Sequence, residues 1–231
     1  VSAAEVGNSI TKDTILVTIM HSNNETGTLQ PVEEIREICA DRGVTFHSDT
    51  AQSVGKMPVS AFADMLTVVS HKFYGPKGIG AIYIKKGLKL SPILFGAGHE
   101  RGMRPGTENV PGIAGLGKAC EIAKRDMENR AAKAKRLREL LYKELERNFK
   151  GVSVNGHRSL CLPNTLNVSI PGADASMAVD ALRDLMAVST GSACHAGVRE
   201  PSPVLKAMGL GDAEALSAFR FSVGKDNTEE E

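Results

Sequence analysis

The 231-residue sequence is 42% hydrophobic and carries 28 basic and 27 acidic side chains, which predicts a soluble, globular protein with ample material for a core. The balanced charge gives no electrostatic reason to expect nucleic acid or an anionic membrane as a partner. No apolar run approaches the roughly 20 residues that cross a bilayer, and the first residues do not resemble a secretion signal. Small molecules are therefore the expected partners, and the cytoplasm is the expected location.

Four cysteines are widely spaced, and no pair of them forms a C-x-x-C motif, so neither a metal site nor a disulfide framework is expected. Cys39, Cys120 and Cys161 lie in apolar or helical contexts, where we expect buried thiols that act as small hydrophobic side chains. Cys194 differs because it ends a loop of small residues that starts at Gly191.

The first half of the chain alternates strand-like and helix-like segments, which indicates an α/β fold. Residues 31–40 predict a helix that begins at a proline, with acidic side chains in its first turn. The first predicted strand spans residues 14–21. Three further strands, each expected to be short and buried, are predicted at residues 44–49, 65–69 and 78–85.

The second half begins with a helical pattern over residues 111–149, whose charged face is expected to be solvated. We then expect an edge strand at 165–170, helices at 175–184 and 203–208, and a strand at 218–223. These patterns predict a large domain over residues 1–126, with a mainly parallel sheet, and a smaller α+β domain over residues 127–231.

Polar side chains gather where the predicted strands end. Ligands bind at the carboxyl ends of parallel strands, so residues scattered along the chain can converge on one crevice. A lysine at the end of an apolar strand loses its proton more easily than a solvated one, and a neutral amine can form a Schiff base with an aldehyde. The side chains at these positions are Asn24, Asp49, Gln52, His71 and Lys72.

Ordered motifs along nearly the whole chain resemble the NifS-like cysteine desulfurases and selenocysteine lyases, which are fold-type I pyridoxal phosphate enzymes of the class V aminotransferase group. The resemblance implies that fold, with pyridoxal 5'-phosphate as the cofactor and no metal. The matching motifs are HSNNETG at residues 21–27, HSDTAQSVGK at 47–56, SHKFYGPKG at 70–78, RPGTEN at 104–109, GSAC at 191–194 and RFS at 220–222.

By this resemblance, Asp49 lies against the ring nitrogen of the cofactor and keeps it protonated. Gln52 donates to the ring hydroxyl, and Asn24 is a second ligand near the same edge that also contacts the substrate. Lys72 is the Schiff-base lysine and moves protons on the substrate. His71 contacts the phosphate, although the family's phosphate-binding serine is replaced here by Val69.

The remaining implied roles concern the substrate and a second subunit. Cys194 takes sulfur or selenium from L-cysteine or L-selenocysteine as a persulfide or its selenium analogue, alanine leaves, and an acceptor protein receives the element, as in iron–sulfur cluster assembly. Arg220 binds the substrate carboxylate, a task that suits a planar guanidinium. Thr107 reaches the phosphate of the neighbouring subunit's cofactor, which implies a homodimer.

The resemblance begins partway into the family's large domain, so we expect an N-terminally truncated chain without the ring-stacking side chain. Cysteine is favoured narrowly over selenocysteine as the substrate. A non-catalytic remnant that partners a full-length homologue, and an aminotransferase-like enzyme that needs no nucleophilic cysteine, are the alternatives.

Overall fold

The computed structural model describes residues 1–190 and 200–231. The chain divides into two compact units, one formed by residues 1–21 and 30–127 and the other by residues 22–29 and 128–231. The second unit thus includes the short segment Ser22–Leu29, which the sequence-based division assigns to the large domain. None of the helices in the described residues is long and apolar enough to cross a membrane.

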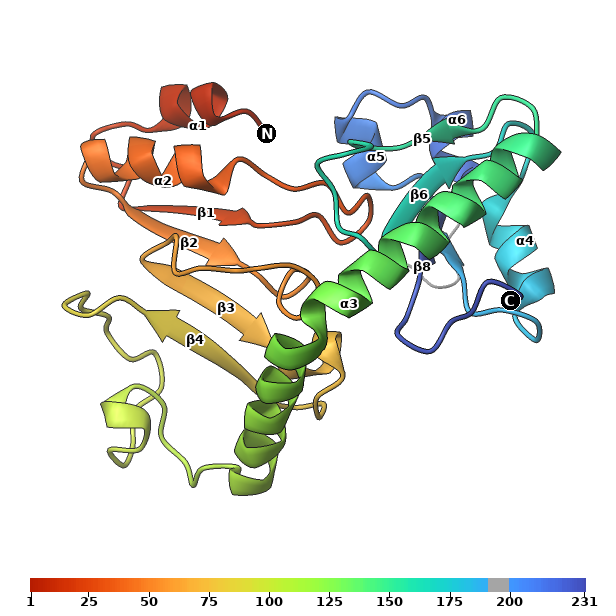
Figure 1. The fold of residues 1–231 in the computed structure, drawn as a ribbon. Helices are drawn as coiled ribbons and strands as arrows, with labels where there is room; N and C mark the ends of the chain where they lie inside the picture. Colours follow the sequence, from red (N-terminus) through yellow and green to blue (C-terminus); the bar gives the residue numbers. More distant parts are fainter. Residues whose placement is uncertain (191–199) are drawn as a thin grey trace. The chain divides into compact units, whose positions relative to one another are not determined.

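The first unit contains a four-stranded sheet in the order β1-β2-β3-β4 (Figure 1). Its strands are β1 (Leu16–Met20), β2 (Thr45–Asp49), β3 (Met65–Val69) and β4 (Gly80–Ile84). The first three are parallel and β4 is antiparallel to β3, so the predicted mainly parallel sheet is confirmed.

Two helices, α1 (Ala3–Ser9) and α2 (Val32–Asp41), pack on one face of this sheet. Ser2 and Glu5 form a capping box that starts α1, a helix that the sequence analysis did not predict. Ile35 and Phe46 are fully buried at the centre of the core. The expectation that β4 is buried is wrong, because most of its residues are exposed on this edge strand.

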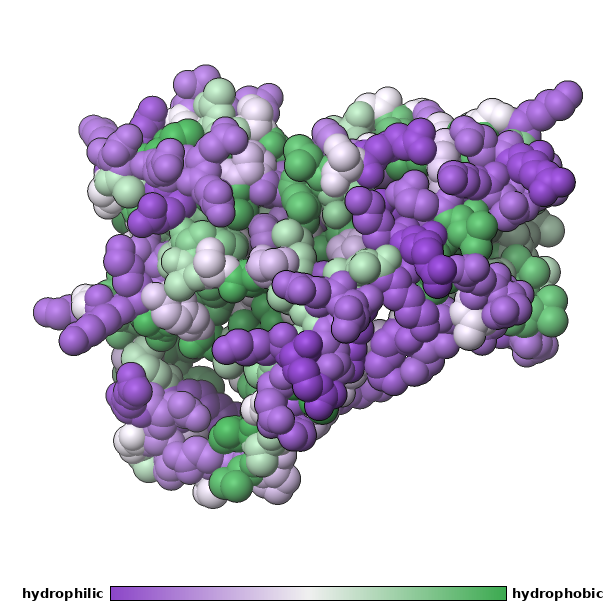
Figure 2. Space-filling model, viewed as in Figure 1, coloured by the Kyte–Doolittle hydropathy of each residue, from purple (hydrophilic) through white to green (hydrophobic). Residues whose placement is uncertain are grey.

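The long helix α3 (Val110–Asn148) follows the short 3-10 turn η2 (Glu100–Gly102) and contributes to both units. Its sequence predicted a helix with a solvated charged face. Figure 2 shows hydrophilic side chains along the part of α3 that faces the viewer, and Lys135, Arg136, Lys143, Glu144, Glu146 and Arg147 in its second half are exposed, whereas Arg138 is buried. Cys120 is exposed on this helix and Cys161 is half-buried, so the prediction of buried thiols holds for Cys39 alone of these cysteines.

The second unit contains an antiparallel sheet in the order β5-β6-β8-β7. Its strands are β5 (Ser153–Val154), β6 (Thr165–Ser169), β7 (Ser189–Thr190) and β8 (Ala218–Ser222), and its short helices are α4 (Ala175–Leu182), α5 (Pro203–Ala207) and α6 (Asp212–Leu216). The prediction that β6 is an edge strand is wrong, because it pairs with β5 and β8 and all its residues are buried. The sequence does not show which distant segments become its neighbours.

Candidate active site

The ends of β2 and β3 form the first cluster of predicted site residues. Asp49 is the last residue of β2 and pairs in register with Thr67 of β3. The next residue, Thr50, is fully buried, and both its amide and its hydroxyl donate to the carbonyl of Thr67, at 3.1 and 2.6 Å. This double contact ties the segment after β2 to β3, so residues that follow the two strands share one edge of the sheet.

The carboxylate of Asp49 projects from this edge. Asp49 is exposed, and its Oδ1 accepts a hydrogen bond from the amide of Ala51 at 2.8 Å. Gln52 lies in the same turn and is half-buried. The carboxylate can accept a hydrogen bond from a protonated ring nitrogen, and the amide of Gln52 can donate one to a neighbouring oxygen.

The segment after β3 forms a short 3-10 turn, η1 (Ser70–Phe73), which carries His71 and Lys72. Phe73 is 3% exposed and anchors the turn, whereas His71 and Lys72 are exposed. Lys72 is therefore held at the strand end by its buried neighbour, with its amine directed away from the core.

Ser70, the first residue of this turn, contributes a buried hydroxyl group. The residue is fully buried, and its Oγ makes no hydrogen bond in the described structure. A side chain on Gly75 would place its Cβ 2.1 Å from this oxygen, so the turn requires glycine there. The predicted loss of a phosphate ligand at Val69 thus coincides with a buried hydroxyl one residue later.

The second cluster lies in the second unit, where Arg220 of β8 meets the 22–29 segment. Nη1 of Arg220 donates to the carbonyl of Asn24 at 3.0 Å. Asn167 of β6 is paired in register with Arg220, and its side-chain amide donates to the carbonyl of Glu25 at 3.1 Å. The structure thus brings together the two residues predicted to contact the substrate.

Buried polar groups support this arrangement. Asn155 donates to the Oδ1 of Asn167 and to the hydroxyl of Ser169, at 2.8 and 2.9 Å. The hydroxyl of Ser202, which also caps α5, donates to the buried carboxylate of Glu25 at 2.5 Å. These residues cannot be recognised from the sequence, because a lone asparagine or serine in a strand or turn carries no signal of burial.

Two further predicted site residues are not part of the clusters described above. Thr107 is exposed in the segment before α3, and no described hydrogen bond joins it to Asp49, Gln52 or Lys72. Cys194 lies outside the described residues, so its predicted role as nucleophile stays a prediction.

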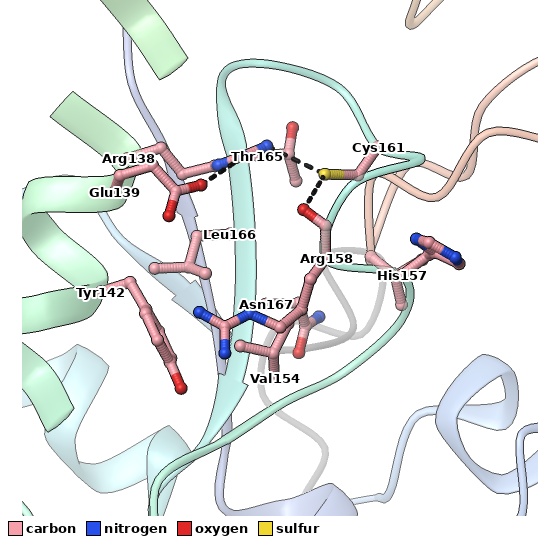
Figure 3. Close-up of a pocket in the computed structure, with 11 residues that line it drawn as sticks. Arg138, Glu139, Tyr142, Val154, His157, Arg158, Cys161, Thr165, Leu166 and Asn167 are labelled. Carbon is pink, nitrogen blue, oxygen red and sulfur yellow. Dashed lines mark hydrogen bonds and ion pairs between the residues drawn. The ribbon is translucent and has the colours of Figure 1, made fainter. Parts of the chain in front are cut away.

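The second unit also contains a small pocket of about 20 Å³ (Figure 3). None of the predicted site residues lines it. Within it, Nη1 of the buried Arg138 donates to the sulfur of Cys161 at 2.9 Å, and Arg158 stacks over the ring of Tyr142 at 4.4 Å. A cavity of this size holds little more than a water molecule.

The first unit also contains a hollow of about 570 Å³ beside Val68, Tyr83 and residues 120–127 of α3. Its described lining is mainly apolar and includes none of the predicted cofactor ligands. Thr50, Val54 and Gly55 also line the hollow, so it adjoins the segment that follows β2.

The fold is that of the fold-type I pyridoxal phosphate enzymes. The family model described as Aminotransferase class-V matches residues 1–231, and the chain belongs to this family.

The chain is 44% identical over 233 residues to a cysteine desulfurase IscS of Anaeromyxobacter dehalogenans, covering 99% of this chain and 57% of that protein. It is 47% identical over 232 residues to a cysteine desulfurase IscS of Histophilus somni, covering 98% of this chain and 57% of that protein. A solved NifS-like protein superimposes with a TM-score of 0.90 at 38% identity, over 100% of this chain and 61% of that one. The chain therefore spans less than two thirds of these relatives.

Proposed function

We propose that the protein is a pyridoxal phosphate-dependent cysteine desulfurase, which converts L-cysteine to L-alanine and leaves a persulfide on Cys194. The observation that carries this proposal is the joint placement of Asp49 and Lys72 at the shared end of β2 and β3. The similar proteins named cysteine desulfurase supply the choice of reaction.

The residues present fit the cofactor. An exposed carboxylate at Asp49, an amide at Gln52 and an accessible amine at Lys72 match the ring nitrogen, ring oxygen and aldehyde of pyridoxal phosphate. The buried Ser70 hydroxyl, which makes no hydrogen bond in the described structure, and the exposed imidazole of His71 are donors for the phosphate. When bound, the cofactor supplies an electron sink that makes the substrate's Cα–H bond acidic.

The protein side chains supply the remaining steps. Asp49 holds a proton on the ring nitrogen, and Lys72 binds the aldehyde and then moves a proton from the Cα of the substrate. Arg220 binds the substrate carboxylate, and the carbonyl of Asn24 fixes the direction of its guanidinium.

Sulfur transfer balances without an external oxidant. The thiolate of Cys194 attacks the sulfur of the substrate and forms a new S–S bond while the C–S bond breaks. The bonding electrons return to the three-carbon fragment, which takes up a proton and leaves as alanine. An acceptor protein that attacks the persulfide then completes a turnover, which would supply sulfur for iron–sulfur cluster assembly.

We also propose a homodimer in which Thr107 contacts the phosphate of the neighbouring subunit's cofactor. Its exposure before α3 leaves its hydroxyl accessible to a second chain.

The test is an absorbance titration of the purified protein with pyridoxal phosphate, followed by addition of L-cysteine and measurement of alanine. We expect a visible band that is lost in Lys72→Ala and kept in Lys86→Ala, whose lysine is also exposed and lies after β4. Alanine should form in the parent protein and be reduced at least 100-fold in Cys194→Ser. A folded parent protein without a band contradicts the proposal and favours a non-catalytic partner of a homologue.

A parallel assay with selenocysteine decides whether the protein prefers a sulfur or a selenium substrate. A higher rate of alanine formation from selenocysteine than from cysteine would reassign the protein as a selenocysteine lyase. Full activity of Cys194→Ser on cysteine would instead indicate an aminotransferase-like enzyme.

A further inference from the structure

Lys56 is a half-buried lysine beside the cofactor cluster, and the proposed reaction gives it no role. It ends the turn that begins at Asp49, and its Nζ donates to the backbone carbonyl of Gln52 at 2.8 Å. The same nitrogen lies 3.5 Å from the side-chain oxygen of Gln52. Both contacts involve the residue predicted to bind the ring oxygen of the cofactor.

The backbone next to Lys56 packs closely against the turn that carries Lys72. Gly55 has a φ of +76°, and a side chain there would place its Cβ 2.6 Å from the Cβ of Phe73. Gly55 and Phe73 directly adjoin Lys56 and Lys72 in the sequence. The tight contact therefore brings the two lysine-bearing segments together.

The electrostatics of Lys56 agree with this geometry. Burial, and then the positive charge of Lys72, lower the pKa of Lys56 from 10.5 to about 8. In the described part of the chain, Lys72 is the charged group that shifts the pKa of Lys56. Two neighbouring cations repel each other, so an ion pair between them does not explain the position of Lys56.

The hydrogen bond has a directional consequence for Gln52. An ammonium group can only donate, so the side-chain atom that faces Lys56 must be the amide oxygen. The NH2 group of Gln52 then points away from Lys56 and stays available as a donor. A glutamine in the opposite orientation would present an oxygen to the ring oxygen of the cofactor and repel it.

We propose that Lys56 is a positioning residue for the pyridoxal phosphate site, where it orients Gln52 toward the ring oxygen and opposes the positive charge of Lys72. This inference rests on the proposed function for its cofactor, but the pairing of the two lysines is a property of the protein alone. Lys56 touches neither substrate nor cofactor in this scheme and acts through Gln52 and Lys72.

The first test needs no cofactor. In the cofactor-free protein, trace acetylation with acetic anhydride over a range of pH, read by mass spectrometry, reports the neutral fraction of each lysine. Lys72→Met removes the second charge, so the pKa of Lys56 rises and its acetylation rate at pH 7.5 falls about threefold or more. Lys86→Met removes a distant exposed lysine and should leave the rate of Lys56 unchanged. Equal acetylation rates of Lys56 in the parent protein and in Lys72→Met would overturn the proposed pairing of Lys56 with Lys72.

The second test measures cofactor binding in Lys56→Met, which removes the charge and the donor, and in Lys56→Arg, which keeps both. We expect Lys56→Met to bind pyridoxal phosphate on the order of tenfold more weakly. The pH midpoint of its visible band should rise by about one unit, because a neighbouring positive charge is lost. Lys56→Arg should restore both values toward those of the parent protein, and circular dichroism should show that each variant is folded.

The two tests separate this inference from the proposed function. A parent protein that binds cofactor, with normal affinity and midpoint in Lys56→Met, overturns the role of Lys56 and leaves the desulfurase proposal intact. A visible band that survives Lys72→Ala but is lost in Lys56→Met would make Lys56 the aldehyde-binding amine and overturn both assignments. A parent protein without a band removes the proposed function and the cofactor role of Lys56 with it, whereas the acetylation result still decides the pairing.

Discussion

The ends of β2 and β3 and the contact between Asn24 and Arg220 are both polar clusters, but they are built in different ways. In the first, Asp49, His71 and Lys72 are exposed, and tight packing beneath them holds the turns. In the second, Asn155 and Asn167 are buried and satisfy one another through hydrogen bonds. Polar groups that bind an external ligand must be held in place by packing, because internal hydrogen-bond partners would occupy them.

Gly55→Ala should have the largest effect on stability and breaks the packing that holds the first cluster. The new methyl group would lie 2.6 Å from the Cβ of Phe73, and the φ of +76° adds backbone strain. We expect a loss of about 3 kcal/mol in the free energy of unfolding, measured by urea denaturation.

Gly43→Ala is the matched control for this substitution. Its φ of +66° is equally strained for alanine, but nothing lies within 4 Å of the new Cβ. We expect a loss of about 1 kcal/mol from strain alone. Similar losses in the two variants would show that the contact with Phe73 does not hold the turn.

Asn167→Ala should have the next largest effect and breaks the second cluster. The side chain is 1% exposed, and its loss leaves the amide of Asn155 and the carbonyl of Glu25 with one partner fewer. We expect the free energy of unfolding to fall by about 2 kcal/mol. Asn148→Ala at the exposed end of α3 is the control and should change stability by less than about 0.5 kcal/mol. A small effect of Asn167→Ala would mean that water replaces the network.

Lys56→Met should have the smallest effect, and it should have the opposite sign. The folded pKa of about 8 lies below the ordinary value of 10.5, so below pH 8 both states are charged and burial destabilises the fold fully. Between these values the folded protein has lost the proton that the unfolded chain still binds, so stability rises with pH. Lys56→Met should therefore stabilise the protein by about 1 to 2 kcal/mol at pH 7, after allowance for partial exposure.

The measurement that checks this prediction is the pH dependence of the stability gained in Lys56→Met. Urea denaturation at pH 9.5 should show roughly half of the gain seen at pH 7 or less, because most folded molecules no longer carry the charge. A gain that does not depend on pH would indicate better packing by methionine rather than removal of a buried charge.

Much of the first unit follows from local sequence. The strand predicted at residues 65–69 is found as β3, and the segment 44–49 contains β2, because β-branched and apolar runs bounded by turn residues favour short strands. The candidate residues at the ends of these strands are also close in sequence to them, so the parallel pairing alone brings Asp49 and Lys72 to one edge. Helix α1 was not predicted, which shows the limit of reasoning from local patterns. Its seven residues give too little periodicity to be recognised as a helix.

The sequence by itself determined the family and the mainly parallel sheet, and it supplied the candidate residues for the proposed chemistry, because motifs and strand patterns are local. Only the tertiary structure decided that β6 is central, that residues 22–29 join the second unit and that Asn167 and Lys56 support their neighbours. Those facts depend on which distant segments pack together. Burial and hydrogen-bond partners are properties of that packing, and the same asparagine or lysine in another environment would remain an ordinary surface residue.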